Sequence, residues 1–203
     1  TAGAVIASVD RATNKIAFEG TVSNVAANDV IYMQNSKDLE ITGLKAIFEA
    51  EELYGITRTG KSWLTPYTKA SFGAMSEDAL QEAIDGVEEY GGGKVNFIVC
   101  SRGVRRKLIT ALSAYRKTET LSLAGGYTAL SFNGIPVVAD RFCPKGTMYL
   151  LNTDDFGLHQ LCDWQWLEGE DGKILKQIPG KPVYTATLVK YAELMCYRPV
   201  GQG

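Results

Sequence analysis

An apolar strand flanked by two amphipathic helices, over residues 76–115, constrains the fold more than any other feature of this sequence. Ser76 is a favourable helix N-cap, and the apolar residues after it share one helical face: Leu80, Ala83, Ile84 and Val87. Glycines 91–93 are predicted to end this helix. The segment VNFIVC (95–100) is apolar on both alternating faces, which predicts a strand that is covered on both sides.

A second helix is predicted after Ser101, which we expect to cap it. Its apolar residues fall in one narrow stripe: Val104, Leu108, Ala111, Leu112 and Tyr115. The unit is therefore helix, buried strand, helix, and a chain built around it must contain a sheet covered by helices.

The segments on either side of this unit carry mostly strand signals. Residues 4–33 contain three strand-like runs broken by polar turns, the last of them DVIYM (29–33), and residues 41–54 indicate a short helix. Asn133-Gly134 predicts a hairpin, in which Pro136 places the second strand at an edge or a bend. Further strands are expected in TMYLLN, DWQWLE and KILKQI, and residues 183–198 indicate one long strand. The fold class is α+β.

Composition excludes several kinds of protein. The 203 residues carry a formal net charge of −2, so the whole chain does not attract phosphates or anionic lipid. No stretch approaches the roughly 20 apolar residues of a membrane helix, and no signal peptide is recognisable, so we expect no membrane partner and no export. Cys100, Cys143, Cys162 and Cys196 form no close pair, and we interpret them as reduced thiols rather than disulfides or zinc ligands.

Residues 55–62, GITRTGKS, match the phosphate-binding pattern GxxxxGK[ST]. Such a loop needs a hydrophobic strand before it and a helix that starts at the Lys-Ser pair. Here an acidic, helix-like segment precedes it, and Pro66 follows closely. We interpret the match as coincidence. The alternative is a P-loop nucleotide-binding enzyme that uses Lys61 and Ser62, with Asp140 holding magnesium.

Charges separate by element around the central unit. Residues 76–93 hold six acids and no base, whereas residues 94–117 hold seven bases and no acid. Two solvated outer helix faces explain this pattern most simply. The alternative is complementarity between copies, with an acidic helix of one copy meeting a basic helix of the next.

No constellation of residues reaches the level of an active site. His159 is the one histidine and has no nucleophile near it in sequence, Asp154-Asp155 is typical of a turn or helix cap, and Glu168, Glu170 and Asp171 surround a turn. Trp164 and Trp166 fit core or interface packing. We therefore predict no enzyme activity, no catalytic residue, no cofactor and no metal site.

The succession of these segments resembles the major capsid proteins of tailed bacteriophages, which have the Hong Kong 97 fold. Five segments carry the resemblance: NDVIYM, TGLKAIFEAEELYGITR with Trp63 after it, SEDALQEAIDGVEEYGGGKVNFIVCSRGVRRKL, GGYTALSFNGIPVVADRFCPKGTMYLLN and YTATLVKYAELMCYRPV. It implies a small β-unit over 1–40, an axial-domain-like region over 41–150, and a β-rich return into a peripheral-domain-like region over 151–203. The family's N-terminal arm, extended loop and long spine helix have no counterpart, and the sequence lacks an initiator Met, so we expect a fragment of a longer chain.

The same resemblance implies a function. It predicts a structural subunit of a phage or prophage capsid, which self-assembles as pentamers and hexamers into an icosahedral shell. That shell would enclose double-stranded DNA without sequence-specific contact, with assembly in the host cytoplasm and residence in the virion. A bacterial nanocompartment shell, which shares the fold and packages an enzyme cargo, is a second alternative. A monomer or small ring is a third for the isolated chain.

Overall fold

The computed structural model describes residues 5–10, 12–13, 15–22, 26, 31–32, 36, 39–113, 119–122 and 128–203. Contacts between residues divide the chain into two compact units, Thr1–Ile41 and Thr42–Gly203. Each unit is described by itself below. Among the described residues, no helix combines the length and the apolar character needed to cross a bilayer.

The first unit contains a β-hairpin. Strands β1 (Ile6–Asp10) and β2 (Lys15–Phe18) pair antiparallel, as their alternating pattern predicts. Asp10 stabilises the turn, because its carboxylate accepts hydrogen bonds from the Ala12 N–H at 2.9 Å and the Thr13 hydroxyl at 2.5 Å. Of the expected third strand, Ile31 and Tyr32 lie outside any strand, and the other residues lie outside the described part of the chain.

The second unit is built around the predicted helix, strand and helix. Helix α2 spans Glu77–Gly91, strand β5 spans Phe97–Cys100 and helix α3 spans Arg102–Ser113. The Ser76 hydroxyl accepts a hydrogen bond from the Ala79 N–H at 3.1 Å, and Gly92 ends α2 in the left-handed conformation (φ 64°). Ser101 precedes α3 as predicted, but its hydroxyl accepts a hydrogen bond from Gly146 N–H in the loop before β9. Its cap role is thus supplied by its backbone carbonyl, to which Arg105 N–H donates.

A five-stranded mixed sheet carries these helices. Its order is β6 (Glu119–Ser122), β7 (Thr128–Phe132), β8 (Ile135–Ala139), β5 and β9 (Met148–Leu151). Strand β5 is parallel to β8 and antiparallel to β9, so it is an interior strand of the sheet. Of the two faces predicted to be covered, the one with Ile98 and Cys100 is buried and the one with Phe97 and Val99 is partly buried. The predicted hairpin between β7 and β8 is confirmed, with Asn133 and Gly134 both at positive φ (49° and 81°).

The prediction that Pro136 places β8 at an edge or bend is wrong, because β8 lies between β7 and β5. Pro136 pairs with Ser131 next to the hairpin's closing pair, Phe132–Ile135, so its nitrogen points away from β7. Pairing of β8 with β5 begins one residue later, at Val137. The missing N–H of Pro136 therefore costs no ladder hydrogen bond.

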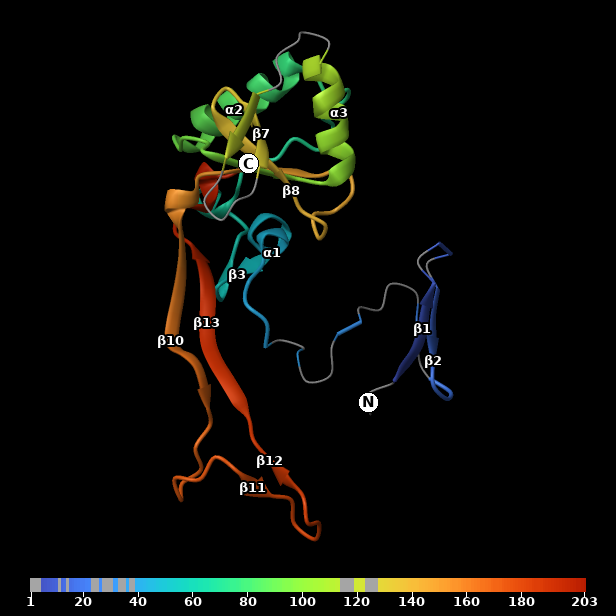
Figure 1. Cartoon of the computed structure of the whole chain (residues 1–203). Helices are drawn as coiled ribbons and strands as arrows, with labels where there is room; N and C mark the ends of the chain where they lie inside the picture. The colour runs from blue at the N-terminus through green and yellow to red at the C-terminus, as the bar shows by residue number, and fades with distance from the viewer. Residues whose placement is uncertain are drawn as a thin grey trace. The chain divides into compact units, whose positions relative to one another are not determined.

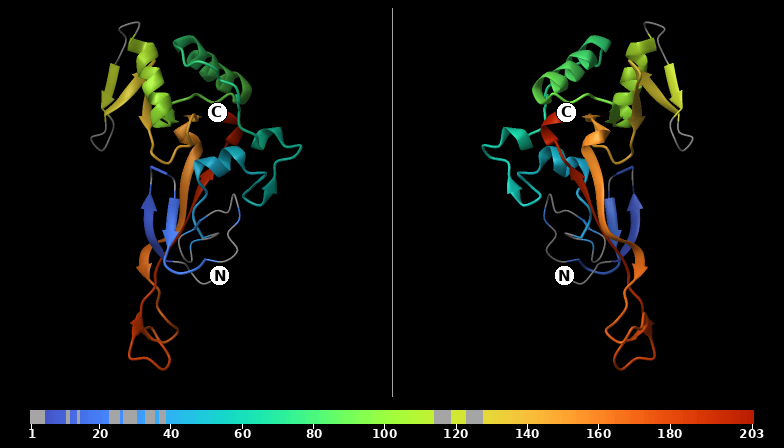
Figure 2. Two further views of the ribbon diagram at one scale, coloured as in Figure 1. Left: turned by 90° about the vertical axis from the view of Figure 1, so that its right-hand side faces the viewer. Right: turned by 90° about the vertical axis from the view of Figure 1, so that its left-hand side faces the viewer.

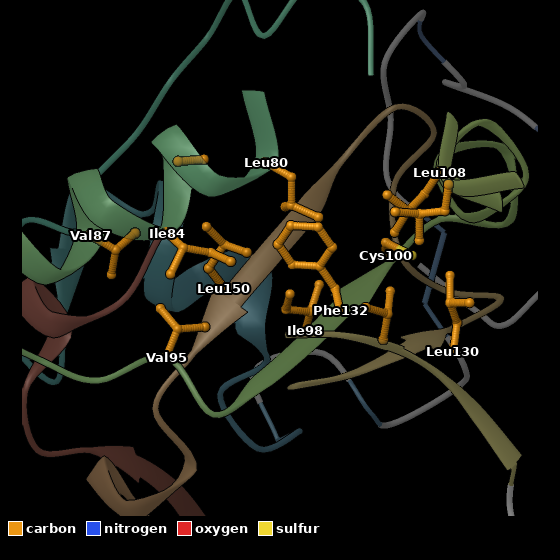
Figure 3. Close-up of a cluster of buried hydrophobic side chains, with 13 residues drawn as sticks. Leu80, Ile84, Val87, Val95, Ile98, Cys100, Leu108, Leu130, Phe132 and Leu150 are labelled. Atoms are coloured by element: carbon orange, nitrogen blue, oxygen red, sulfur yellow. The ribbon is translucent and has the colours of Figure 1, made fainter. Parts of the chain in front are cut away.

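The main hydrophobic core lies between this sheet and the two helices (Figure 3). The four apolar residues predicted for α2 are all buried, and so are Leu108 and Leu112 of α3. They pack with side chains from strands β5, β7, β8 and β9 and with Val95 before β5: Val95, Ile98, Cys100, Leu130, Phe132, Val137 and Leu150. Burying one such side chain stabilises the fold by about 1.5–3 kcal/mol, so this cluster is the main source of stability in the second unit.

The helix predicted over residues 41–54 is shorter than expected. Helix α1 spans Leu44–Glu49, and the chain then forms the small hairpin β3 (Glu52–Leu53) and β4 (Ile56–Thr57). Tyr54 and Gly55 turn this hairpin at positive φ (52° and 75°). Arg58 caps the end of the helix, because its guanidinium donates to the carbonyls of Ala46, Ile47 and Phe48 in the last turn. The Ala46 carbonyl also accepts from the Ala50 N–H at 3.0 Å.

Residues 156–197 form a long two-stranded ribbon, which we call the arm (Figure 1). Strands β10 (Phe156–Trp166) and β13 (Leu188–Cys196) pair antiparallel, and β11 (Lys176–Gln177) pairs with β12 (Tyr184–Thr185) at the distal end. Eleven residues in β10 give this ribbon a length on the order of 35 Å. The single strand predicted over 183–198 is thus divided into β12 and β13, which pair with different partners.

The C-terminal residues tie the base of the arm to the sheet. A 3₁₀ turn, Pro199–Gly201, leads to Gln202, which is fully buried. The Gln202 side chain accepts from Asn152 N–H at 2.8 Å and donates to the Asp155 carboxylate at 3.1 Å. Gly203 then exchanges backbone hydrogen bonds with Leu150 of β9. These bonds fix the position at which the arm leaves the sheet.

Candidate functional site

The arm exposes many large apolar side chains. Leu161 is 91% exposed and Trp164 is 65% exposed, values typical of side chains on an extended loop and not of a packed sheet. Eleven further apolar residues of the arm are also exposed: Leu158, Trp166, Leu167, Ile174, Leu175, Val183, Tyr184, Leu188, Tyr191, Met195 and Tyr197. An apolar surface of this extent usually marks a contact with another molecule.

Apolar residues occupy both faces of the ribbon. Directly paired residues of antiparallel strands point to the same face. Leu158 pairs with Leu194, and Trp166 pairs with Leu188 on that same face. The opposite face carries Tyr191 and Met195, at odd-numbered positions of β13. A two-stranded ribbon is marginally stable in water by itself, so a ribbon that is apolar on both sides needs covering layers.

Only the base of the arm is covered by the described chain. Cys196 and Leu194 pack against Ile47, Leu53 and Leu64, which come from α1, β3 and the 3₁₀ turn Ser62–Leu64. Beyond this cluster the side chains of β10 and β13 are mostly exposed. The distal two thirds of the arm is therefore the part that requires a partner.

Tyr54 locks the base of the arm in place. Its hydroxyl accepts from Cys196 N–H at 2.8 Å and donates to the Leu194 carbonyl at 2.9 Å. Burial is the main cause of the raised pKa of Tyr54, and burial likewise lowers the pKa of the neighbouring Arg58. Both groups lie at the junction between α1 and the arm, where they hold backbone atoms.

Polar pairs are interspersed with the apolar residues of the arm. Lys190 Nζ lies 2.8 Å from Asp163 Oδ1 and 5.9 Å from the centre of the Trp164 ring. The hydrogen bond from Lys190 is the main cause of the lowered pKa of Asp163. His159 Nε2 lies 2.7 Å from the Tyr197 hydroxyl. Apolar area with a polar rim is the usual composition of a protein–protein interface.

The two long edges of the ribbon are also open. Within the described residues, β10 and β13 pair with each other and with no other strand. Exposed strand edges present rows of N–H and C=O groups that can pair with a strand of another chain. Two irregularities in the β10 register, at residues 160–162 and 162–165, interrupt one of these edges.

Residues 55–62 do not form a phosphate-binding loop. The strand before the motif, β3, has only two residues, β4 lies inside the motif, and Ser62 begins a three-residue 3₁₀ turn instead of an α-helix. Lys61 Nζ donates to the Thr57 carbonyl at 3.1 Å. Asp140 accepts from the Phe142 N–H at 2.6 Å in the turn after β8. The convergent N–H groups that phosphate requires are absent from segment 55–62.

The remaining candidate residues lie apart from one another. His159 is on the arm, Asp154 and Asp155 are in the 3₁₀ turn before β10, and Glu168, Glu170 and Asp171 are in the turn after β10. Residues 169–172 form the predicted turn, closed by a hydrogen bond from Gly172 N–H to the Gly169 carbonyl. In the described ranges, no group of three His, Cys, Asp or Glu residues is placed to hold a metal ion.

All four cysteines are free thiols, as predicted. Burial raises the pKa of Cys100 and of Cys196 to about 11. Both side chains belong to hydrophobic clusters. Trp164 and Trp166, by contrast, are exposed on the arm. Packing in the core is therefore excluded for them, and packing at an interface stays a prediction.

Sequence reasoning missed the arm as a site. The predicted strand DWQWLE (163–168) covers only the end of β10, and the predicted strand over 183–198 covers β13. Apolar residues on two adjacent strands are also typical of a buried sheet. The pairing of β10 with β13, across more than twenty residues of sequence, is what places these side chains on a free ribbon. Tyr54 was likewise placed in a helix, which concealed its bonds to the arm.

Comparisons with known proteins give limited information. No family model matches the chain, and no curated protein matches it. Among solved structures, the chain is similar to one from the cryo-EM structure of the holo-SrpI encapsulin complex of Synechococcus elongatus PCC 7942. The two are 15% identical with a TM-score of 0.47, over 68% of this chain and 50% of that one. The chain thus spans about half the length of that protein, and no residue role is transferred from it.

Proposed function

We propose that this chain is a structural subunit of a self-assembling protein shell with a Hong Kong 97-like fold. The observation that carries the proposal is the arm, whose apolar residues are exposed on both faces over its distal part. The resemblance described in the sequence analysis supports the same function. The compact sheet and helices supply a rigid body, and the arm supplies the reach to neighbouring copies.

Magnitudes favour many contacts along the arm over a few isolated ones. Association costs roughly 4–15 kcal/mol in lost translational and rotational freedom. Burying one large apolar side chain returns about 1.5–3 kcal/mol, so two or three side chains do not offset that cost. Thirteen exposed apolar residues on one arm do, provided that neighbouring copies cover most of them.

The contents of the shell form a separate part of the proposal. The sequence resemblance implies a phage or prophage capsid that encloses double-stranded DNA. A nanocompartment with an enzyme cargo is the alternative within the same class. Both uses need the same subunit contacts, so the arm supports the shell and does not distinguish its contents.

The arm is tested with paired variants of the protein expressed from its complete reading frame. Leu161→Ser with Tyr191→Ser removes two exposed apolar side chains from the arm. Phe142→Ser is the matched control, because Phe142 is 81% exposed in the loop between β8 and β9. Assembly is measured by light scattering after size-exclusion chromatography and by negative-stain electron microscopy.

We expect wild type and Phe142→Ser to assemble equally, and the arm variant to stay folded but to need at least a tenfold higher concentration for assembly. Equal assembly of the arm variant contradicts the proposed role of the arm. The contents are read from the same particles, where DNA protected from nuclease supports a capsid and a stoichiometric enzyme supports a nanocompartment.

A further inference from the structure

The solvent-facing side of α2 is a continuous acidic stripe. Asp78, Glu82, Asp85 and Glu89 follow a spacing of four, three and four residues, which places them on one face of the helix. This face is opposite the buried residues of α2. Asp85 also accepts a hydrogen bond from Gln81 at 2.7 Å, which holds its carboxylate on the stripe.

A groove runs along this stripe. It has a volume of about 780 Å³ and is lined by the acidic residues together with Tyr67, Gln81, Gly86 and Tyr90. Tyr90 is half exposed, and the Tyr67 and Tyr90 rings lie 6.1 Å apart at one side. Carboxylates beside aromatic rings suit guanidinium and ammonium groups, which form ion pairs and cation–π contacts.

Helix α3 carries the complementary charge. Arg102 and Arg106 are exposed one turn apart, and the exposed Ile109 continues the same stripe. Lys107 is exposed on a neighbouring part of the helix surface. Arg116 and Lys117, which belong to the same basic run in the sequence, lie outside the described residues.

Within one copy the two stripes do not neutralise each other. Helices α2 and α3 lie over different parts of the sheet, as Figures 1 and 2 show. Among the described residues, the base that reaches the acidic stripe is Lys69, which precedes α2 and lies 2.7 Å from Glu82. No ion pair between described residues joins Asp78, Asp85 or Glu89 to α3.

We infer that the acidic groove of α2 receives the basic stripe of α3 from a second copy of this chain. The contact is heterologous, since different surfaces of the two copies meet, and repetition of such a contact closes a ring when the rotation between copies allows it. This inference rests on the proposed function and deepens it, by naming the surfaces through which copies meet around an axis. The arm provides apolar area, while the charged stripes fix which copies meet and in which register.

A nucleic acid is a poorer occupant of the basic stripe. Phosphate-binding proteins usually present a basic domain, whereas this chain has a net charge of −2 and an acidic helix on the same sheet. In a ring of copies, the acidic stripe of each copy meets one neighbour and its basic stripe meets the other, so both stripes are paired.

Charge reversal tests the inference in the protein expressed from its complete reading frame. Variant A carries Asp78→Lys and Asp85→Lys, and variant B carries Arg102→Glu and Arg106→Glu. A control variant, Glu51→Lys with Glu52→Lys, changes charge as variant A does at exposed positions outside both stripes. Circular dichroism and thermal unfolding show that each variant is folded, and light scattering measures assembly at 0.1 M NaCl.

Variants A and B alone each place like charges at every contact, so we expect each to need at least a tenfold higher concentration than wild type for assembly. One chain that carries all four substitutions restores every contact, because its basic α2 stripe meets the acidic α3 stripe of the next copy. An equimolar mixture of A and B restores every contact only in rings with an even number of copies, where A and B alternate. The control assembles as wild type does. A four-substitution chain that is folded but stays disassembled while wild type assembles overturns the inference and leaves the shell proposal standing.

Two other outcomes separate the remaining explanations. Wild-type assembly with unchanged assembly of A and B also overturns the inference, and loss of binding to a 30-base-pair DNA duplex by B in that case assigns the basic stripe to nucleic acid. Absence of any self-association by wild type overturns the shell proposal itself.

Discussion

Tyr54 shows how one side chain fixes the geometry of a much larger element. Its hydroxyl bonds to the backbone of residues 194 and 196 at the base of the arm, and its ring packs with the cluster beneath. It occupies a positive φ of 52° in the β3–β4 turn, where Gly or Asn is the more usual residue. The cost of that conformation is offset by the contacts that Tyr54 makes with the arm.

The Tyr54→Phe variant removes both hydrogen bonds and leaves the Cys196 N–H without this acceptor. We expect a loss of about 1–3 kcal/mol in the free energy of unfolding, because a buried donor is left unsatisfied. Urea denaturation followed by circular dichroism measures the change. Tyr184→Phe, at an exposed position of β12, is the control and should be neutral; equal stabilities of the two variants would argue against the role of the Tyr54 hydroxyl.

A substitution of Lys61 tests the alternative function, a P-loop nucleotide-binding enzyme. Because Lys61 bonds to the Thr57 carbonyl and no α-helix starts at Ser62, we expect no measurable binding of ATP with Mg²⁺. Isothermal titration calorimetry of wild type and Lys61→Ala should give the same flat result. Micromolar binding by wild type that disappears in Lys61→Ala would restore the enzyme alternative.

At the scale of elements, the sequence predicted helices, strands and turns correctly where interactions between residues close in sequence determine them. The Ser76 cap, the α2 stripe, strand β5 and the Asn133-Gly134 turn all follow from short-range rules of capping, periodicity and turn conformation. The predictions were wrong where residues distant in sequence determine the structure. Arg58 ends α1 from outside the helix, and the register of β8 relative to β5 determines that Pro136 is tolerated in an interior strand.

The arm illustrates the same limit for the candidate site. Each of its strands was recognisable, but whether Leu158 or Tyr191 is buried depends on which sheet the strands join. In this structure they join no larger sheet among the described residues, so apolar side chains that usually indicate a core form a surface.

The reactivity of Cys162 reports whether the arm is covered by another molecule. It pairs with Tyr191 on β10–β13 and is partly exposed, whereas Cys100 and Cys196 are buried. We expect Cys162 to react with a thiol reagent at pH 8 in the dissociated chain and to be protected at least tenfold on assembly. Cys100 and Cys196, with a pKa of about 11, should react slowly in both states.

Mass spectrometry of the labelled peptides distinguishes the four thiols. Unchanged labelling of Cys162 in assembled material would show that the middle of the arm is not covered. The Cys162→Ser variant, measured in parallel, confirms which peptide carries the signal.

At the scale of the whole molecule, the compact sheet with its helices and the arm have different roles. The sheet with α2 and α3 contains the main core and is stable through its own packing, while the arm exposes apolar area that its own chain does not cover. A subunit of a symmetric assembly has this character, because the same modest contact is repeated in every copy.

Electron microscopy of the protein expressed from its complete reading frame, across a range of concentrations, tests this account most directly. It predicts closed particles, or rings of a fixed number of copies, in which the arm of each subunit lies against its neighbour. A uniform monomer at every concentration, with the arm free in solution, would contradict it.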